Sequence, residues 1–240
     1  ELDTLFTEDD IIVTNGTLDD FQDASGDDVD HSYYSVKFYP KEQSLCTIRV
    51  LGGSFEDAVG NLNNPSNEFK WTYDITPPTI EITATDVSNN DISSNETSND
   101  AYLNLTFTAS KEIEGFEFEN VIVENGELNS TIGDGDFDTS DNIIFTAELY
   151  PFGTQNSVVV YVDISSVIDT VGNYNDTSSN TFTWLYDGSN ATVSIFDTTD
   201  NENSIEGKHS NTNPVTFTIG IDELDTLFTE DDIIVTNGTL

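Results

Sequence analysis

The stretch Phe6 to Leu18, FTEDDIIVTNGTL, decides how this chain folds, because it occurs three times. It returns unchanged at Phe228 to Leu240 and in the altered form FEFENVIVENGEL at Phe116 to Leu128. The outer copies belong to longer identical stretches, Glu1 to Leu18 and Glu223 to Leu240, so the sequence repeats with a period of 222 residues. The middle copy divides this period into offsets of 110 and 112 residues. We therefore expect a tandem array of one unit of about 110 residues.

Around the middle copy, short runs of alternating apolar and polar residues are separated by Gly, Pro, Asn and Asp. Leu103 to Phe107 and Val158 to Val162 show this alternation clearly. A period of two is typical of half-buried antiparallel strands, and no helical period of useful length is present. About seven short strands in such a unit predict an all-β fold, the immunoglobulin-like β-sandwich, repeated head to tail.

The repeat also predicts where the domains lie. Residues 79–187 form one complete unit, whereas the other unit is divided between the two ends of the sequence. We expect residues 1–78 to be the C-terminal part of an Ig-like domain and residues 188–240 to be the N-terminal part. The next 222-residue period should complete the latter, because each half alone leaves strand edges and apolar faces bare.

The composition is strongly acidic, with 46 Asp and Glu against 6 Lys and Arg and a net charge of -40. Binding to nucleic acid or to an anionic membrane requires basic residues, so neither is expected as a partner. The acidity favours cations, calcium above all, although a soluble, self-repelling surface is an alternative explanation. Cys46 is the single cysteine, so no disulfide can form within one period. Its alternation with Ile48 and Val50 places it on a buried face and favours a structural thiol over a reactive one.

Several short motifs lie in a common order along both units. They are Asp10 to Leu18 and Asn120 to Leu128, Asp57 to Asn61 and Asp169 to Asn173 (both D-x-x-G-N), and Trp71 to Pro78. This order resembles the bacterial Ig-like repeats of giant extracellular adhesins. The resemblance implies an extracellular or cell-surface protein in which most units serve as spacers, and it implies calcium at some joints between units.

The joints between units are the candidate metal sites. Strand order in a seven-stranded sandwich should bring acidic groups and Asn carbonyls together there, and such oxygens suit a calcium ion with six to eight ligands. The candidate ligands are Asp74, Glu112, Asp169 and Asn173 at one joint, and Asp187, Asp57 and Asn61 at the other. The alternative is that D-x-x-G-N is only a turn, in which Gly and Asn serve the backbone geometry.

Seven asparagines lie in sequences suited to N-linked glycosylation. None of them occupies an expected core position, so each is a candidate acceptor, although turns also favour Asn. They are Asn15, Asn95, Asn104, Asn129, Asn175, Asn190 and Asn237.

No arrangement of residues indicates an active site. The only histidines, His31 and His209, lie in non-equivalent loops without a nucleophile motif. We therefore expect a structural segment of a long extracellular filament or adhesin stalk, glycosylated and stiffened by calcium, whose partners are adjacent copies of the same repeat. An adhesin module that binds a glycan or a surface is the alternative, and an accessory domain of an enzyme is a third hypothesis.

Overall fold

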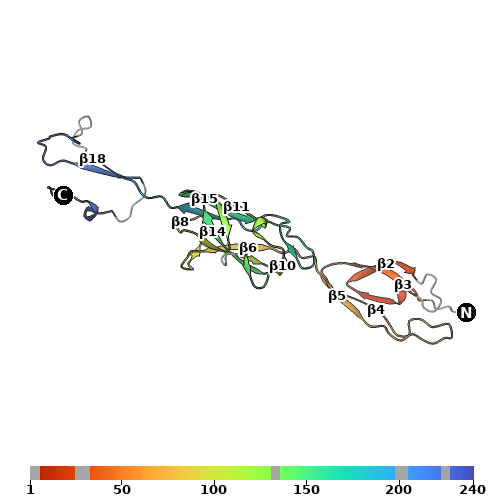
Figure 1. Ribbon diagram of the computed structural model, residues 1–240. Helices are drawn as coiled ribbons and strands as arrows, with labels where there is room; N and C mark the ends of the chain where they lie inside the picture. Colours follow the sequence, from red (N-terminus) through yellow and green to blue (C-terminus); the bar gives the residue numbers. More distant parts are fainter. Residues whose placement is uncertain (1–5, 25–32, 131–135, 198–204, 223–227) are drawn as a thin grey trace.

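The computed structural model describes residues 6–24, 33–130, 136–197, 205–222 and 228–240. Within these residues the regular elements are β-strands and three short 3-10 turns, and no helix is long and apolar enough to span a bilayer. The prediction of an all-β fold is therefore confirmed. Figure 1 shows three bodies in line along an elongated molecule, with the termini at opposite ends. We call them the N-terminal body (residues 6–73), the middle domain (79–187) and the C-terminal body (188–240).

One sheet of the middle domain contains six strands. Their order is β12 (Gly126–Asn129), β14 (Ile144–Pro151), β9 (Leu103–Ala109), β6 (Ile80–Thr85) and β7 (Asp91–Ile92), and β13 (Asp138–Thr139) pairs with β14 beside this path. All pairs are antiparallel. The pairing of β9 with β14 joins the first part of the domain to the second, so the sheet depends on both parts.

The second sheet lies across the core from the first. Its order is β11 (Val121–Glu124), β15 (Gln155–Val162), β17 (Phe182–Asp187) and β8 (Glu96–Ser98), with β8 parallel to β17. A short pair, β10 (Ile113–Glu114) and β16 (Ile168–Asp169), forms a separate two-stranded ladder. Side chains from both sheets form a single hydrophobic cluster. The architecture is therefore the predicted β-sandwich.

The core of the sandwich follows the alternation seen in the sequence. Leu103, Leu105 and Phe107 have no exposed surface, and the polar residues between them are half-buried. Each such side chain contributes about 1.5–3 kcal/mol by leaving water. Trp184 is also fully buried, and its indole nitrogen donates to Ser98 Oγ at 3.0 Å, which satisfies its polar atom. Packing and hydrogen bonding therefore both fix the centre of the domain.

The thirteen-residue stretch connects the two sheets. It forms the turn η2 (Phe118–Asn120), then β11 in one sheet and β12 in the other. An Asn-Gly pair commonly reverses the chain between two strands that pair with each other. Asn125 and Gly126 do not form such a hairpin, because β11 pairs with β15 and β12 pairs with β14. Asn125 has a φ of 60°, and its side-chain amide donates to Ser157 O at 2.8 Å, which holds the bend.

The N-terminal body contains only the second part of a sandwich. One sheet corresponds to β11–β15–β17 and the other to β12–β14. The strands are β1 (Ile11–Thr14), β4 (Ser44–Val50) and β5 (Phe69–Tyr73) in the first sheet, and β2 (Gly16–Asp23) and β3 (Tyr34–Pro40) in the second. Cys46 is free and fully buried, as predicted.

The C-terminal body contains the first part of a sandwich as a single antiparallel pair, β18 (Val193–Asp197) and β19 (Phe217–Ile221). It ends in the third copy of the repeated stretch. There the turn η3 (Glu230–Asp232) matches η1 (Glu8–Asp10) in the first copy, because the same local bonds hold both. Residues 233–236 nevertheless form no strand, and Ile234 is 94% exposed.

The matching residue of the first copy, Ile12, is 39% exposed and lies in β1, which pairs with β4. Identical sequences thus form a strand in one place and none in the other. The difference lies in the neighbouring strand. The turns η1 and η3 need only their own side chains, whereas a strand at residues 11–14 or 233–236 needs a partner strand such as β4.

We predict that Gly126→Ala destabilises the middle domain. A β-carbon at residue 126 would lie 2.7 Å from Tyr150 O and 2.9 Å from Val158 Cγ1, so the bend between the sheets would have to move. The expected loss is about 1–3 kcal/mol of unfolding free energy. Thermal unfolding followed by Trp184 fluorescence in a Trp71→Phe background measures it. Glu127→Ala, at the exposed neighbouring position, is the control; equal stability of the two variants would contradict this account of the bend.

Candidate functional site at the joint before the middle domain

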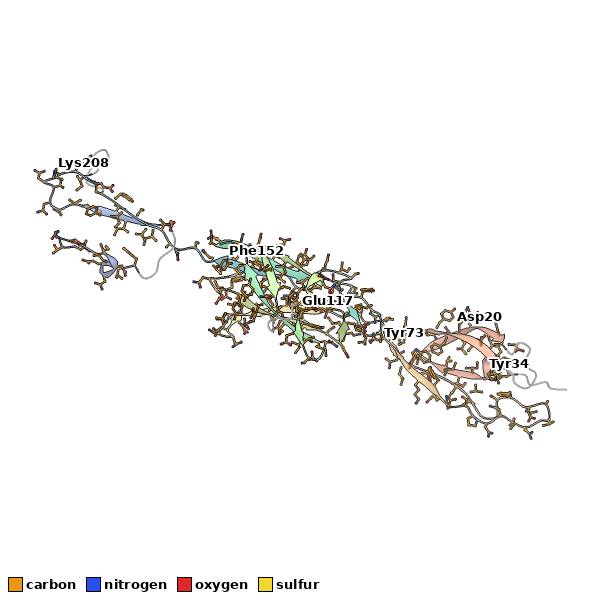
Figure 2. The ribbon with its side chains drawn as sticks, in the orientation of Figure 1. Asp20, Tyr34, Tyr73, Glu117, Phe152 and Lys208 are labelled. Carbon is orange, nitrogen blue, oxygen red and sulfur yellow. The ribbon has the colours of Figure 1, made fainter. Side chains whose placement is uncertain are left out.

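Lys111 connects the end of the N-terminal body to the middle domain. Its ammonium lies 2.8 Å from Asp74 Oδ2 and 3.0 Å from Asp169 Oδ2, and it also donates to Thr76 O at 2.8 Å. Asp74 directly follows β5, whereas Asp169 ends β16. Figure 2 labels Tyr73 at this narrow connection between the two bodies. One cation therefore bridges the linker and a turn of the next domain.

The turn after β16 is organised by Asp169. Its Oδ1 accepts from the backbone nitrogens of Val171 and Asn173 at 3.0 and 2.8 Å, and its Oδ2 accepts from Asn173 Nδ2 at 3.0 Å. Gly172 has a φ of 98°, which favours glycine. Asp57 organises the same turn in the N-terminal body. The D-x-x-G-N motif is therefore a turn built on its aspartate.

The linker itself is held by hydrogen bonds of its backbone. Thr76 N donates to Asp74 Oδ1 at 2.9 Å, and Asn173 Nδ2 donates to Asp74 O at 3.2 Å. Pro78 is fully buried, and proline fixes its own φ. The connection is therefore bonded to the domain that it enters, unlike a flexible linker.

The charges at the joint depend on one another. Asp169 is 2% exposed, and burial opposes its ionisation, yet the hydrogen bonds from Asn173 and Lys111 outweigh that effect and hold its pKa well below the usual range. The Lys111 ammonium also lowers the pKa of Asp74, and the hydrogen bond to Asp74 raises the pKa of Lys111. All three groups are therefore charged at neutral pH, and the buried carboxylate keeps its counter-ion.

Three predicted calcium ligands, Asp74, Asp169 and Asn173, lie together here, but their arrangement does not fit calcium. The carboxylates bind the ammonium of Lys111, and Asn173 points its amide NH2, not its oxygen, at them. Glu112 is exposed and makes no hydrogen bond to this site among the described residues. No group of three or more His, Cys, Asp or Glu suited to a metal occurs in the described part of the chain.

Sequence reasoning did not find Lys111, because only oxygen ligands were considered at the joint. A signal was present, since this residue is one of six basic residues and directly precedes the predicted ligand Glu112. In a chain so short of cations, a lysine beside predicted carboxylates indicates an ion pair.

The predicted ligands of the second joint are divided between the middle domain and the N-terminal body. Asp187 ends β17, whereas Asp57 and Asn61 lie in the N-terminal body, so the structure does not bring them together. The 112-residue offset puts Glu223 at the position of Lys111; it lies outside the described residues. Calcium at this joint stays a prediction.

Most of the predicted glycosylation sites lie on the surface. Asn104 is half-buried, and its amide donates to Asp86 O at 3.3 Å. The exposed acceptors are Asn15, Asn95, Asn129, Asn190 and Asn237.

Asn175 differs, because it is 2% exposed. Its Nδ2 donates to Asp163 O and Thr177 O at 2.8 and 2.9 Å, and its Oδ1 accepts from the nitrogens of Ser166 and Val167. A glycan on this nitrogen would break the loop. The expectation that no acceptor lies in the core is therefore wrong for Asn175.

The two histidines add no site to this picture. His31 lies outside the described residues, and His209 is exposed in the C-terminal body.

We predict that Asp169 makes the middle domain sensitive to acid. Its pKa is lower in the folded state than in the unfolded chain, where it is near 3.8, so the unfolded chain binds more protons below about pH 5. The stabilisation is complete above that pH and is lost as the pH falls through the folded-state pKa. Asp169→Asn should lower stability by about 2 kcal/mol at pH 7 and flatten the slope between about pH 5 and 3.

Trp184 fluorescence in urea titrations at several pH values measures this effect. Asp57→Asn is the matched control, because Asp57 forms the same turn on an exposed surface of another body. An unchanged slope in Asp169→Asn would refute the assignment.

The comparisons with known proteins agree with this architecture. Residues 74–185 match the model of the bacterial Ig-like domain family, and the match begins at Asp74 of the joint. Neither the curated proteins nor the solved structures gave a match. Domains of this family are typically non-enzymatic structural or surface-associated modules on extracellular proteins. Residues 74–185 are therefore similar to a bacterial Ig-like domain.

Proposed function

We propose that this chain is a structural segment of a long extracellular filament or adhesin stalk, in which Ig-like domains follow one another head to tail. The joint at Lys111 is the observation that carries this proposal. An ion pair with a buried carboxylate, together with backbone hydrogen bonds, holds the middle domain to the residue that ends the preceding body. A protein that transmits force or spans distance needs such stiff connections, and each further 222-residue period would add one of them.

The charge of the chain supports the same role. A net charge of -40 makes neighbouring units repel one another and favours an extended array over a collapsed one. The partners are then adjacent copies of the same repeat, and this segment contacts neither nucleic acid nor a membrane.

Electron microscopy of the native protein tests the proposal. Each sandwich is on the order of 40 Å long, so rods should show an axial repeat of two units, about 80 Å. The repeat is of two units because the two halves of each period differ in sequence. Isolated globular particles would be incompatible with a stalk.

We further propose that the exposed acceptor asparagines carry glycans that cover the rod. The two units of a period would be covered differently, because Asn15 and Asn237 precede Gly-Thr, whereas the matching Asn125 precedes Gly-Glu. Asn175 is excluded by its buried hydrogen bonds. Intact-mass measurement of native protein, before and after removal of N-glycans, tests this proposal; equal masses would refute it.

We propose that calcium binds at the joint that follows the middle domain, and not at the joint before it. The first joint has its own cation, Lys111, whereas Glu223 takes that position at the second. With Asp187 and Asp57 at the positions of Asp74 and Asp169, the second joint gathers three carboxylates. Their oxygens are suitable ligands for calcium, which would neutralise them and connect the two units.

Lys111→Glu tests this proposal by giving the first joint the acidic residue of the second. In the presence of a chelator, the melting temperature of the middle domain should fall by on the order of 10 °C, because Asp169 loses its counter-ion. Millimolar calcium should restore much of that loss. Lys111→Met is the control, since it removes the cation without adding a ligand, and its melting temperature should not respond to calcium. A calcium response that is the same in both variants, or absent from Lys111→Glu, would contradict the proposal.

A further inference from the structure

The strands of the C-terminal body are equivalent to the strands β6 and β9 of the middle domain. Val193 lies opposite Ile221 as Ile80 lies opposite Ala109. The bonds beside these pairs also match. Asp222 N donates to Thr192 O as Ser110 N donates to Thr79 O, and each residue's side chain accepts from the opposite nitrogen. The hairpin of β18 and β19 therefore has the same pairing as β6 and β9, the first strands of the middle domain.

This hairpin presents the side chains that a complete domain would bury. Ile195 is 60% exposed and Phe217 is 55% exposed. Their equivalents Ile82 and Leu105 are 2% and 0% exposed, because β14 and the second sheet cover them. The apolar face of the hairpin therefore stays exposed, and among the described residues no strand other than its own pair covers it.

The N-terminal body has a strand edge at which such a hairpin could pair. Its strand β3 corresponds to β14, but on the side where β14 pairs with β9, no strand pairs with β3 among the described residues. Tyr34, which corresponds to Phe145, is 37% exposed, against 3% for Phe145. The body thus has an open strand edge beside a partly exposed aromatic residue.

An incomplete aromatic cluster lies beside that edge. Phe6 packs against Phe21, Tyr34 and Phe55 with ring centroids 5.1–5.6 Å apart. The corresponding cluster of the middle domain contains one further ring from β9, that of Phe107, which contacts Phe116 at 5.8 Å. The 112-residue offset makes Ile219 of β19 the equivalent of Phe107. The cluster of the N-terminal body therefore lacks a ring or side chain at this position, and Ile219, the equivalent residue, is half-buried on β19 of the C-terminal body.

We propose that the C-terminal hairpin of one copy of this chain binds the N-terminal body of a second copy and completes an Ig-like domain between them. Strand β19 pairs antiparallel with β3, in the register that β9 and β14 show. Tyr34 then lies opposite Ile219, and Val36 opposite Phe217, as Phe145 lies opposite Phe107 and Ala147 opposite Leu105. In a longer array of the same period, the following copy would supply the same pairing within one chain.

Two features of the chain support a second copy as the partner. The two halves lie at opposite ends of the elongated molecule, with the middle domain between them, so they do not meet within one copy (Figure 1). The repeated stretch is also present in both halves, and only one copy of it fits into a domain. The copy at Phe6 to Leu18 already pairs with β4 and β3, so the copy at Phe228 to Leu240 is the one left outside.

A cysteine pair in the intact 240-residue chain tests the register. In the proposed pairing, Ser35 lies opposite Thr218 on the outer face, as Thr146 lies opposite Thr106. Directly opposed residues of an antiparallel pair are close enough for a disulfide. The double variant Ser35→Cys, Thr218→Cys should form a ladder of disulfide-linked oligomers on a non-reducing gel. Ser35→Cys, Thr216→Cys is the control, because its two positions are offset by two residues and should link at least 10-fold less.

Light scattering at increasing concentration tests the association itself. The unmodified chain should show a mass that rises from one copy to two or more, and added salt should strengthen association because both halves are acidic. Ile219→Asp should leave only the monomer, whereas Thr218→Asp, on the other face of the same strand, should still associate. Trp184 fluorescence of the middle domain reports whether each variant is folded elsewhere. A monomer at every concentration, or equal cross-linking in both cysteine pairs, would overturn the proposal.

Discussion

The pairing of β9 with β14 is the interaction on which the sandwich of the middle domain depends. It joins the first part of the unit to the second, through six residue pairs from Ile144–Thr108 to Leu149–Leu103. Where this pairing exists, both strands are buried on their inner faces and one contiguous core forms. Where it is missing, as at β3 and β19, the core positions are only partly buried, and Tyr34 and Phe217 are exposed. Pairing between the first and second parts of a unit, more than the β-propensity of any strand, therefore decides where a buried core forms.

That dependence explains what the sequence alone could predict. Alternation at Leu103 to Phe107 predicted a strand and its buried face, because a strand with one face in the core requires that period. The bend at Asn125 could not be predicted from its Asn-Gly pair, because that pair indicates a hairpin only where the two flanking strands pair with each other. Here each strand pairs with a different neighbour, and the choice is made by β14 and β15, which lie far along the chain.

The joint before the middle domain shows that long-range contacts also limit the prediction of a site from sequence. The turn role of Asp169 could be proposed from its own motif, since all the turn bonds lie within five residues. The bonds of Lys111 join residues 37 and 58 positions away, and no local pattern contains them. The burial of Asn175 was missed for a related reason, because its sequence satisfies the acceptor pattern while its contacts tie together a loop in three dimensions.

Asp57 and Asp169 build the same turn, yet one is exposed and the other is buried beside a cation. The turn therefore does not determine the charge state of the joint; the residue at position 111, or 223 in the other unit, does. A lysine there pairs with both carboxylates, so this joint has a cation of its own. A glutamate there adds a charge that must be screened, paired or bound by a cation from outside. A period with one joint of each kind would combine a joint that is held by an internal ion pair with a joint whose charges depend on ions from the solution.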